Sequence, residues 1–171
     1  QRSAHLVHQL LSLARTEAEV ALLPVDAAAL AREVAREWTP RAVAAGVDLG
    51  YEGEESLMVP ADKLLLREAL SNLLDNALDF TPPGGVLRWS TRGEDGQLWV
   101  CLYNSGPAIP DYALARLTER FYSLPRPTTG RKSTGLGLNF VQEVVNLHGG
   151  TLRVGNVPGG VEVGLRLPTL A

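Results

Sequence analysis

The sequence lacks several features that would assign it to a class at once. It has a single cysteine among 171 residues, so an internal disulfide is excluded. No stretch reaches the roughly 18 apolar residues of a membrane-spanning helix. The net charge is −3, and the largest basic cluster, from Arg126 to Lys132, suits a phosphate better than a nucleic-acid duplex. We therefore expect neither nucleic-acid binding nor membrane contact from this chain.

The chain begins at Gln1 rather than Met, so we expect it to be a piece of a longer protein. Hydrophobic residues make up 45% and charged residues 20%, as in a soluble globular domain. Apolar spacing and turn signals predict helices and antiparallel hairpins, and this mixture favours an α+β two-layer sandwich. The expected helices cover 1–20, 27–45, 61–79, 111–121 and a segment opening near Gly135. The expected strands cover 46–51, 56–59, 86–92, 97–103, 151–154 and 161–167.

The stretch KSTGLGLNFVQEVVNLHGG, residues 132–150, runs from a polar loop into an amphipathic helix. Glycines at a helix start let backbone N–H groups approach an anion closely, and the helix dipole favours negative charge there. Ser133 and Thr134 add hydroxyl groups, and Lys132 adds a positive charge. A loop whose glycines serve only backbone geometry explains the same residues, so the motif alone leaves both interpretations open.

The third expected helix carries asparagines four residues apart, Asn72 and Asn76, along one edge of its apolar stripe. Asparagine lowers helix propensity, because its side chain competes for backbone hydrogen bonds. Amide oxygens are ligands that Mg²⁺ accepts beside substrate phosphates and water. A solvated helix face is an equally good interpretation at this point.

A strand is expected to end at Asn104, before the turn Gly106-Pro107-Ala108-Ile109-Pro110. The Asn104 amide can hydrogen-bond the edge of a nucleobase, and Ile109 can pack on the face of the base. An ordinary strand-ending turn is the alternative.

The order of these elements resembles the nucleotide-binding domain of sensor histidine kinases, in the superfamily that includes gyrase, Hsp90 and MutL. NLLDNALDF resembles the N box, NSGPAIP the G1 box, ERFY the F box and STGLGL the G2 box. DNALDFTP, followed later by PDYALARLTERFYSLPRP, more closely resembles CreC-type sensor kinases. The resemblance implies a Bergerat-type fold, with a mixed, mainly antiparallel sheet and three main helices on one face. It also implies a catalytic ATP-binding domain over 21–171, preceded at 1–20 by part of a dimerisation helix.

The resemblance assigns roles to matching positions. Asn72 and Asn76 would hold Mg²⁺ against the triphosphate of ATP, and Asn104 would face the adenine amino group. Residues 122–134 would form a lid that closes over the nucleotide. The implied nucleotide-binding set is Asn72, Asn76, Phe80, Asn104, Gly106, Ala108, Ile109, Lys132, Ser133, Thr134, Gly135, Leu136, Gly137 and Leu138.

Four positions depart from the family pattern. Asn104 replaces an Asp, which removes a charge-assisted hydrogen bond and predicts weaker nucleotide binding. Ala108 and Ser133 replace glycines, which is tolerable where the backbone angles are ordinary. Asp79 stands where a Lys is common, and its carboxylate would repel the triphosphate unless a cation lies between them.

None of His5, His8 and His148 has the phosphoacceptor context that the resemblance implies, so we expect the catalytic acceptor to lie outside this chain. The resemblance implies a histidine-containing dimerisation domain and a response-regulator receiver domain as partners. It also implies a full-length homodimer anchored in the inner membrane, with this domain in the cytoplasm. An amide at Asn72, where related ATPases carry a glutamate base, favours phosphotransfer over hydrolysis. The alternatives are a degenerate docking module and, less favoured, an anti-sigma serine kinase.

Overall fold

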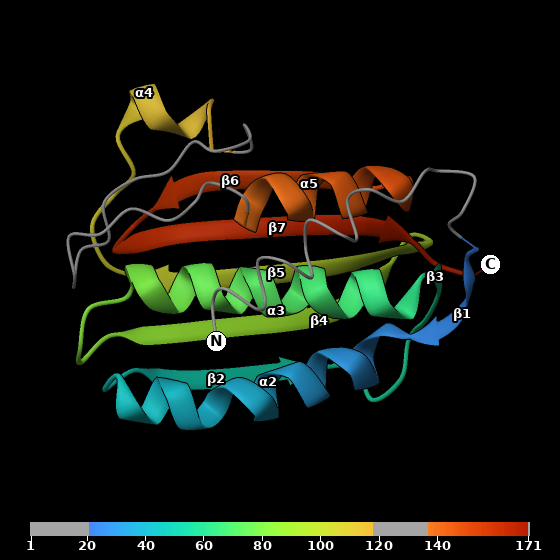
Figure 1. Ribbon diagram of the computed structural model, residues 1–171, viewed down its shortest axis with the longest axis horizontal. Helices are drawn as coiled ribbons and strands as arrows, with labels where there is room; N and C mark the ends of the chain where they lie inside the picture. Colours follow the sequence, from blue (N-terminus) through green and yellow to red (C-terminus); the bar gives the residue numbers. More distant parts are fainter. Residues whose placement is uncertain (1–20, 118–136, 171) are drawn as a thin grey trace.

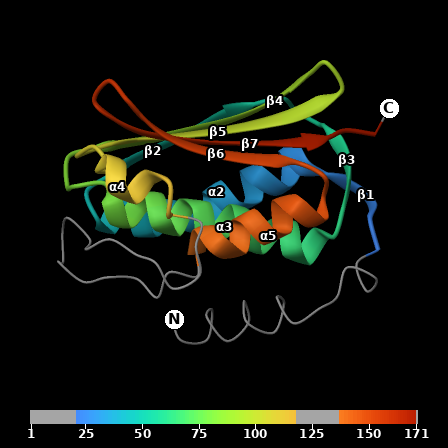
Figure 2. The same cartoon turned by 90° about the horizontal axis from the view of Figure 1, so that it is seen from above.

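The computed structural model describes residues 21–117 and 137–170, which form two layers (Figures 1 and 2). One layer is a five-stranded sheet in the order β2-β4-β5-β7-β6, in which β2 and β4 are parallel and the other neighbours antiparallel. The other layer holds α2, α3 and α5, which cover one face of the sheet. The predicted α+β sandwich is confirmed. The strands are β2 (Asp48–Gly53), β4 (Val86–Glu94), β5 (Gln97–Ser105), β6 (Thr151–Val157) and β7 (Gly160–Pro168); the helices are α2 (Ala27–Ala44), α3 (Lys63–Phe80) and α5 (Gly137–Leu147).

A second, two-stranded sheet lies at one end of the helix layer. It pairs β1 (Leu23–Asp26) with β3 (Met58–Ala61) in antiparallel register. Strand β1 was not predicted, because Pro24 argues against a strand. Proline is tolerated in an edge strand, however, because the side of an edge strand that faces away from its partner needs no N–H donor.

The core forms where alternating strand residues meet the apolar stripes of the helices. On β5, Leu98, Val100 and Leu102 are buried as their alternation predicts. On α5, Phe140 and Val144 are at most 2% exposed, which confirms the predicted apolar face. Burial of these side chains fixes the faces that α3 and α5 turn toward the sheet.

Aspartates begin two of the helices. Asp26 caps α2, as an Asp directly before a helix predicts, and its Oδ1 accepts the Ala29 N–H at 3.1 Å. Asp62, which the sequence analysis did not select, caps α3 through the Leu65 N–H at 3.0 Å. Desolvation raises the pKa of Asp26, but hydrogen bonds from Leu57, Ala29 and Ser56, together with the nearby positive charge of Arg32, outweigh it and lower this pKa below 3.8.

Three predicted boundaries were wrong. The helix expected at 111–121 is the short α4 (Asp111–Leu114) within the described residues. Strand β5 continues through Asn104 to Ser105, because both residues pair with β7. The last hairpin is tighter than expected: β6 runs to Val157, and Gly159 takes a φ of 82°, which lets a short turn close it. Asn156 therefore lies in a strand and not in a loop.

Candidate functional site

Asn72 and Asn76 lie one turn apart on α3, the central helix of the layer. Asn72 is only 3% exposed, whereas Asn76 is half-buried. The neighbouring stripe of Leu66, Leu70 and Leu73 is fully buried against the sheet and the other helices. A solvated helix face is therefore the wrong interpretation for Asn72, because its side chain lies at the boundary between the core and the edge of the layer.

A buried histidine joins the end of α5 to the start of α3. His148 is 4% exposed; its Nε2 accepts the Asp62 N–H at 3.0 Å, and its Nδ1 lies 2.7 Å from the Val144 carbonyl oxygen. A ring that accepts at Nε2 and donates from Nδ1 is neutral, in the Nδ1–H tautomer. We call this end of the helix layer, with Asp62, His148 and the small sheet, the closed end. No sequence signal pointed to this contact.

The contact at His148 sets where α5 begins relative to α3. The two helices lie side by side (Figure 2) and pack directly on each other. Gly137 precedes His148 by eleven residues, which is about 16 Å along a helix at a rise of about 1.5 Å per residue. The same distance along α3 from Asp62 ends between Asn72 and Asn76. The amino terminus of α5 is therefore level with the stretch of α3 that carries the two asparagines.

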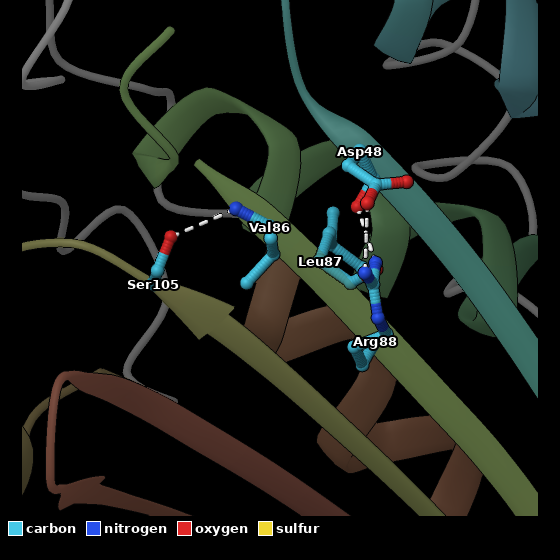
Figure 3. Close-up of polar contacts among 5 residues, drawn as sticks. All are labelled: Asp48, Val86, Leu87, Arg88 and Ser105. Atoms are coloured by element: carbon cyan, nitrogen blue, oxygen red, sulfur yellow. Dashed lines mark hydrogen bonds and ion pairs between the residues drawn. The ribbon is translucent and has the colours of Figure 1, made fainter. Parts of the chain in front are cut away.

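The end of α3 is tied to the end of β5. The Ser105 hydroxyl accepts the Val86 N–H at 2.9 Å, immediately after the turn that follows α3 (Figure 3). Gly106 has a φ of 144°, and a Cβ there would lie 3.0 Å from the Phe80 carbonyl oxygen. This close approach requires glycine. We call this end of the layer, with Phe80, the 105–110 turn and Gly137, the open end.

The residues predicted to enclose the base lie at this open end. Asn104 is 5% exposed, and its Nδ2 donates to the Ser105 carbonyl oxygen at 3.3 Å. Phe80 and Ile109 are half-buried, and Ala108 is exposed. Asp95 is the one non-glycine residue with positive φ in the described part of the chain, so Ala108 has ordinary backbone angles. Alanine is therefore tolerated in this turn.

Some predicted site residues lie outside the described part of the chain: Lys132, Ser133, Thr134, Gly135 and Leu136, with the first part of the G2 motif and the whole of the expected lid, 122–134. Gly137 is the first residue of α5, and Leu138 is half-buried against the core. One contact residue of the 105–110 turn was missed altogether. Asn156 on β6 hydrogen-bonds the backbone of Ile109, and only the tertiary structure brings these two residues together.

The face of the sheet that no described helix covers presents a separate, shallow hollow. It is lined by charged side chains of both signs, including Glu52, Arg92 and Glu162, around the half-buried Cys101. At its edge, Arg88 pairs with Asp48 at 2.8 Å across β2 and β4 (Figure 3). Within the described ranges, no helix is long and apolar enough to cross a membrane, and no three His, Cys, Asp or Glu side chains form a metal-binding group.

An α+β sandwich with a glycine turn and a helix start level with two asparagines defines a nucleotide-binding class of protein. The family model of histidine kinase-, DNA gyrase B- and HSP90-like ATPases matches residues 61–171. The chain is 45% identical to the sensor protein CreC of Escherichia coli K12 over 169 residues, which is 97% of this chain and 35% of that protein. The chain belongs to this family, as a histidine kinase catalytic domain.

Solved structures agree. The catalytic domain of the histidine kinase ThkA superposes with a TM-score of 0.77 at 25% identity, covering 86% of this chain and 95% of that one. Full-length ShkA in complex with AMPPNP gives a TM-score of 0.78 at 30% identity, covering 96% of this chain and 35% of that one. The chain thus spans about a third of the length of CreC and of ShkA.

Proposed function

We propose that this domain binds Mg-ATP at the open end of the helix layer. The observation that carries the proposal is the placement of the α5 amino terminus level with Asn72 and Asn76, set by the His148 contact at the other end. A helix amino terminus favours phosphate oxygens, and amide oxygens are ligands that Mg²⁺ accepts. The family membership supports ATP as the nucleotide.

The proposed pocket divides into a base part and a phosphate part. Asn104, Phe80 and Ile109 enclose the base, since they lie on the turn and helix end that Gly106 holds together. Gly137 and Leu138 begin the helix that receives the phosphates, together with Lys132–Leu136 before it. Asn72 and Asn76 hold the metal, which would neutralise the charge of the phosphates when bound.

The proposed reaction of the full-length protein is transfer of the γ-phosphoryl group to a histidine of a dimerisation domain, and then to an aspartate of a response-regulator receiver domain. We propose that residues 1–20 belong to that dimerisation domain and that 21–171 form the catalytic domain of a membrane-anchored homodimer. An amide cannot take a proton from water at neutral pH, so Asn72 supports phosphotransfer over hydrolysis.

Calorimetric titration with a non-hydrolysable ATP analogue, with and without Mg²⁺, tests this function. We expect saturable binding that tightens with Mg²⁺, and an Asn76→Ala variant that loses the Mg²⁺ effect. The exposed Asn146, in the last turn of α5, provides the matched control Asn146→Ala, which should bind like the parent. Absence of binding to the parent protein would favour a docking module instead, with the Asn104 substitution as the first cause to examine.

A further inference from the structure

The tip of the β6–β7 hairpin holds the turn that carries Ile109. The Asn156 Oδ1 accepts the Ile109 N–H at 2.8 Å, and the Asn156 Nδ2 donates to the Ile109 carbonyl oxygen, also at 2.8 Å. A primary amide has a donor and an acceptor on one planar group, so a single side chain satisfies both backbone groups of one residue. Asn156 thus acts on Ile109 as a neighbouring strand would.

The hairpin holds the same turn at a second point. The Gly106 N–H donates to the Gly159 carbonyl oxygen at 3.1 Å, and Gly160, the first residue of β7, pairs with Ser105, the last residue of β5. A Cβ on Gly160 would lie 2.0 Å from the Asn104 carbonyl oxygen, so the two strands approach too closely for any other residue. The hairpin tip therefore contacts the turn at its start and near its end.

We propose that Asn156 is a positioning residue for nucleotide binding, because it fixes the backbone of Ile109 before the nucleotide arrives. The proposal rests on the function proposed above, in which Ile109 forms a wall of the base pocket. A backbone left free in the unbound protein must be ordered on binding, and ordering one residue weakens affinity by roughly fivefold to thirtyfold. The hydrogen bonds of Asn156 remove that cost.

Asn156 suits such a role because the fold does not depend on its side chain. The residue is exposed, and both bonds connect it to a surface turn and not to the core. Water can replace the lost partners after truncation, so the thermal midpoint should hardly move. Loss of the bonds should instead appear in the mobility of residues 105–110 and in nucleotide affinity.

The test combines calorimetry with hydrogen exchange. For Asn156→Ala we expect roughly tenfold weaker binding of the Mg²⁺-loaded ATP analogue, with an unchanged Mg²⁺ effect and thermal midpoint. The Ile109 amide should exchange faster in the free variant than in the free parent. Asn156→Asp keeps an acceptor for the Ile109 N–H but loses the donor, so its affinity should lie between the two. Asn146→Ala, which removes an exposed amide bonded within α5, should match the parent in every measurement.

Equal affinity of the parent and Asn156→Ala would overturn the proposal. So would a fall in the thermal midpoint of Asn156→Ala large enough to explain its weaker binding by partial unfolding. Unchanged exchange at Ile109 would also contradict it, and that readout needs no nucleotide. Failure of the parent to bind any nucleotide would instead overturn the proposed function, and with it the role of Asn156.

Discussion

The two ends of the helix layer are built differently. At the closed end, bonds between side chain and backbone cross from one element to another, as His148 does between α5 and Asp62. Asp26 likewise links the start of α2 to Leu57 and Ser56. At the open end, such bonds hold a surface turn and not two helices: the exposed Asn156 bonds the backbone of Ile109, and the half-buried Ser105 accepts the Val86 N–H.

This difference separates stability from binding along one pair of helices. The closed end fixes the position of α5, and the open end uses that position. Changes at the closed end should therefore lower the free energy of unfolding more than they alter nucleotide affinity, whereas changes at the open end should alter nucleotide affinity and leave the free energy of unfolding almost unchanged. The predictions below test that separation, beginning with the largest expected effect.

Phe140→Ala should destabilise α5 along its whole length and so affect both ends of the helix layer. Phe140 is fully buried in the first half of α5, where it packs into the core. Truncation leaves a cavity and should lower the free energy of unfolding by about 3–5 kcal/mol, as measured by urea denaturation. Phe140→Leu, which fills more of the space, should lose clearly less. Equal losses for the two variants would argue against tight packing at this position.

His148→Leu should affect the closed end alone. The substitution removes the histidine acceptor of the half-buried Asp62 N–H, which should cost about 1–3 kcal/mol of unfolding free energy. His148→Gln can still place an acceptor near that N–H, so it should retain part of the stability. Thermal unfolding and calorimetry on the same samples provide the check. A variant that is as stable as the parent but binds nucleotide poorly would reverse the roles of the two ends.

Asp26 tests the closed end through pH. Because its pKa is lowered in the folded protein, the charged carboxylate contributes stability that is present above the unfolded pKa, roughly 3.9, and lost as pH falls through the folded value. Asp26→Ala should cost about 0.5–2 kcal/mol near neutral pH, since it removes the cap, and Asp26→Asn should cost less. The difference between the parent and Asp26→Asn should disappear in acid. If the two proteins still differed in stability in acid, the negative charge of Asp26 would not be the cause of the difference.

Asn104→Asp tests the open end. A carboxylate accepts a stronger hydrogen bond from the amino group of adenine, so affinity for ATP should rise by roughly fivefold to tenfold, or about 1 kcal/mol. Asn146→Asp adds the same charge in the last turn of α5 and should leave affinity unchanged. Calorimetry distinguishes the two. Unchanged or weaker binding by Asn104→Asp would place the base elsewhere.

Cys101, on the uncovered sheet face, is a reference point away from both ends. Burial, helped by a hydrogen bond to Glu162 and its charge, raises the pKa of the thiol to about 11. Alkylation near pH 8 should therefore be on the order of a hundredfold slower than for a free cysteine. Glu162→Gln should speed it. Because the fold favours the neutral thiol, this contribution to stability is full below the unfolded pKa and falls as pH rises toward 11. Rapid alkylation of the parent at neutral pH would contradict the shift.

Local patterns in the sequence were sufficient for most of the fold. The alternation at Leu98, Val100 and Leu102 predicted a half-buried strand, and the spacing on α5 predicted its buried face, because periodicity reports burial directly. The order of the motifs predicted the family, which the comparisons confirm. The capping role of Asp26 was also local, since a cap needs only the residues that follow it.

Contacts between distant segments were decided by the tertiary structure alone. His148 reaches Asp62 across 86 positions, and Asn156 reaches Ile109 across 47. Neither pair leaves a local pattern, because an isolated histidine or asparagine has the same neighbours in sequence whether or not it meets a distant backbone. The sequence determined which helices and strands form and which residue types are present for a nucleotide. Tertiary contacts decided that α5 begins level with Asn72 and Asn76, because the His148 bonds and the burial of both helices on one sheet fix their relative position.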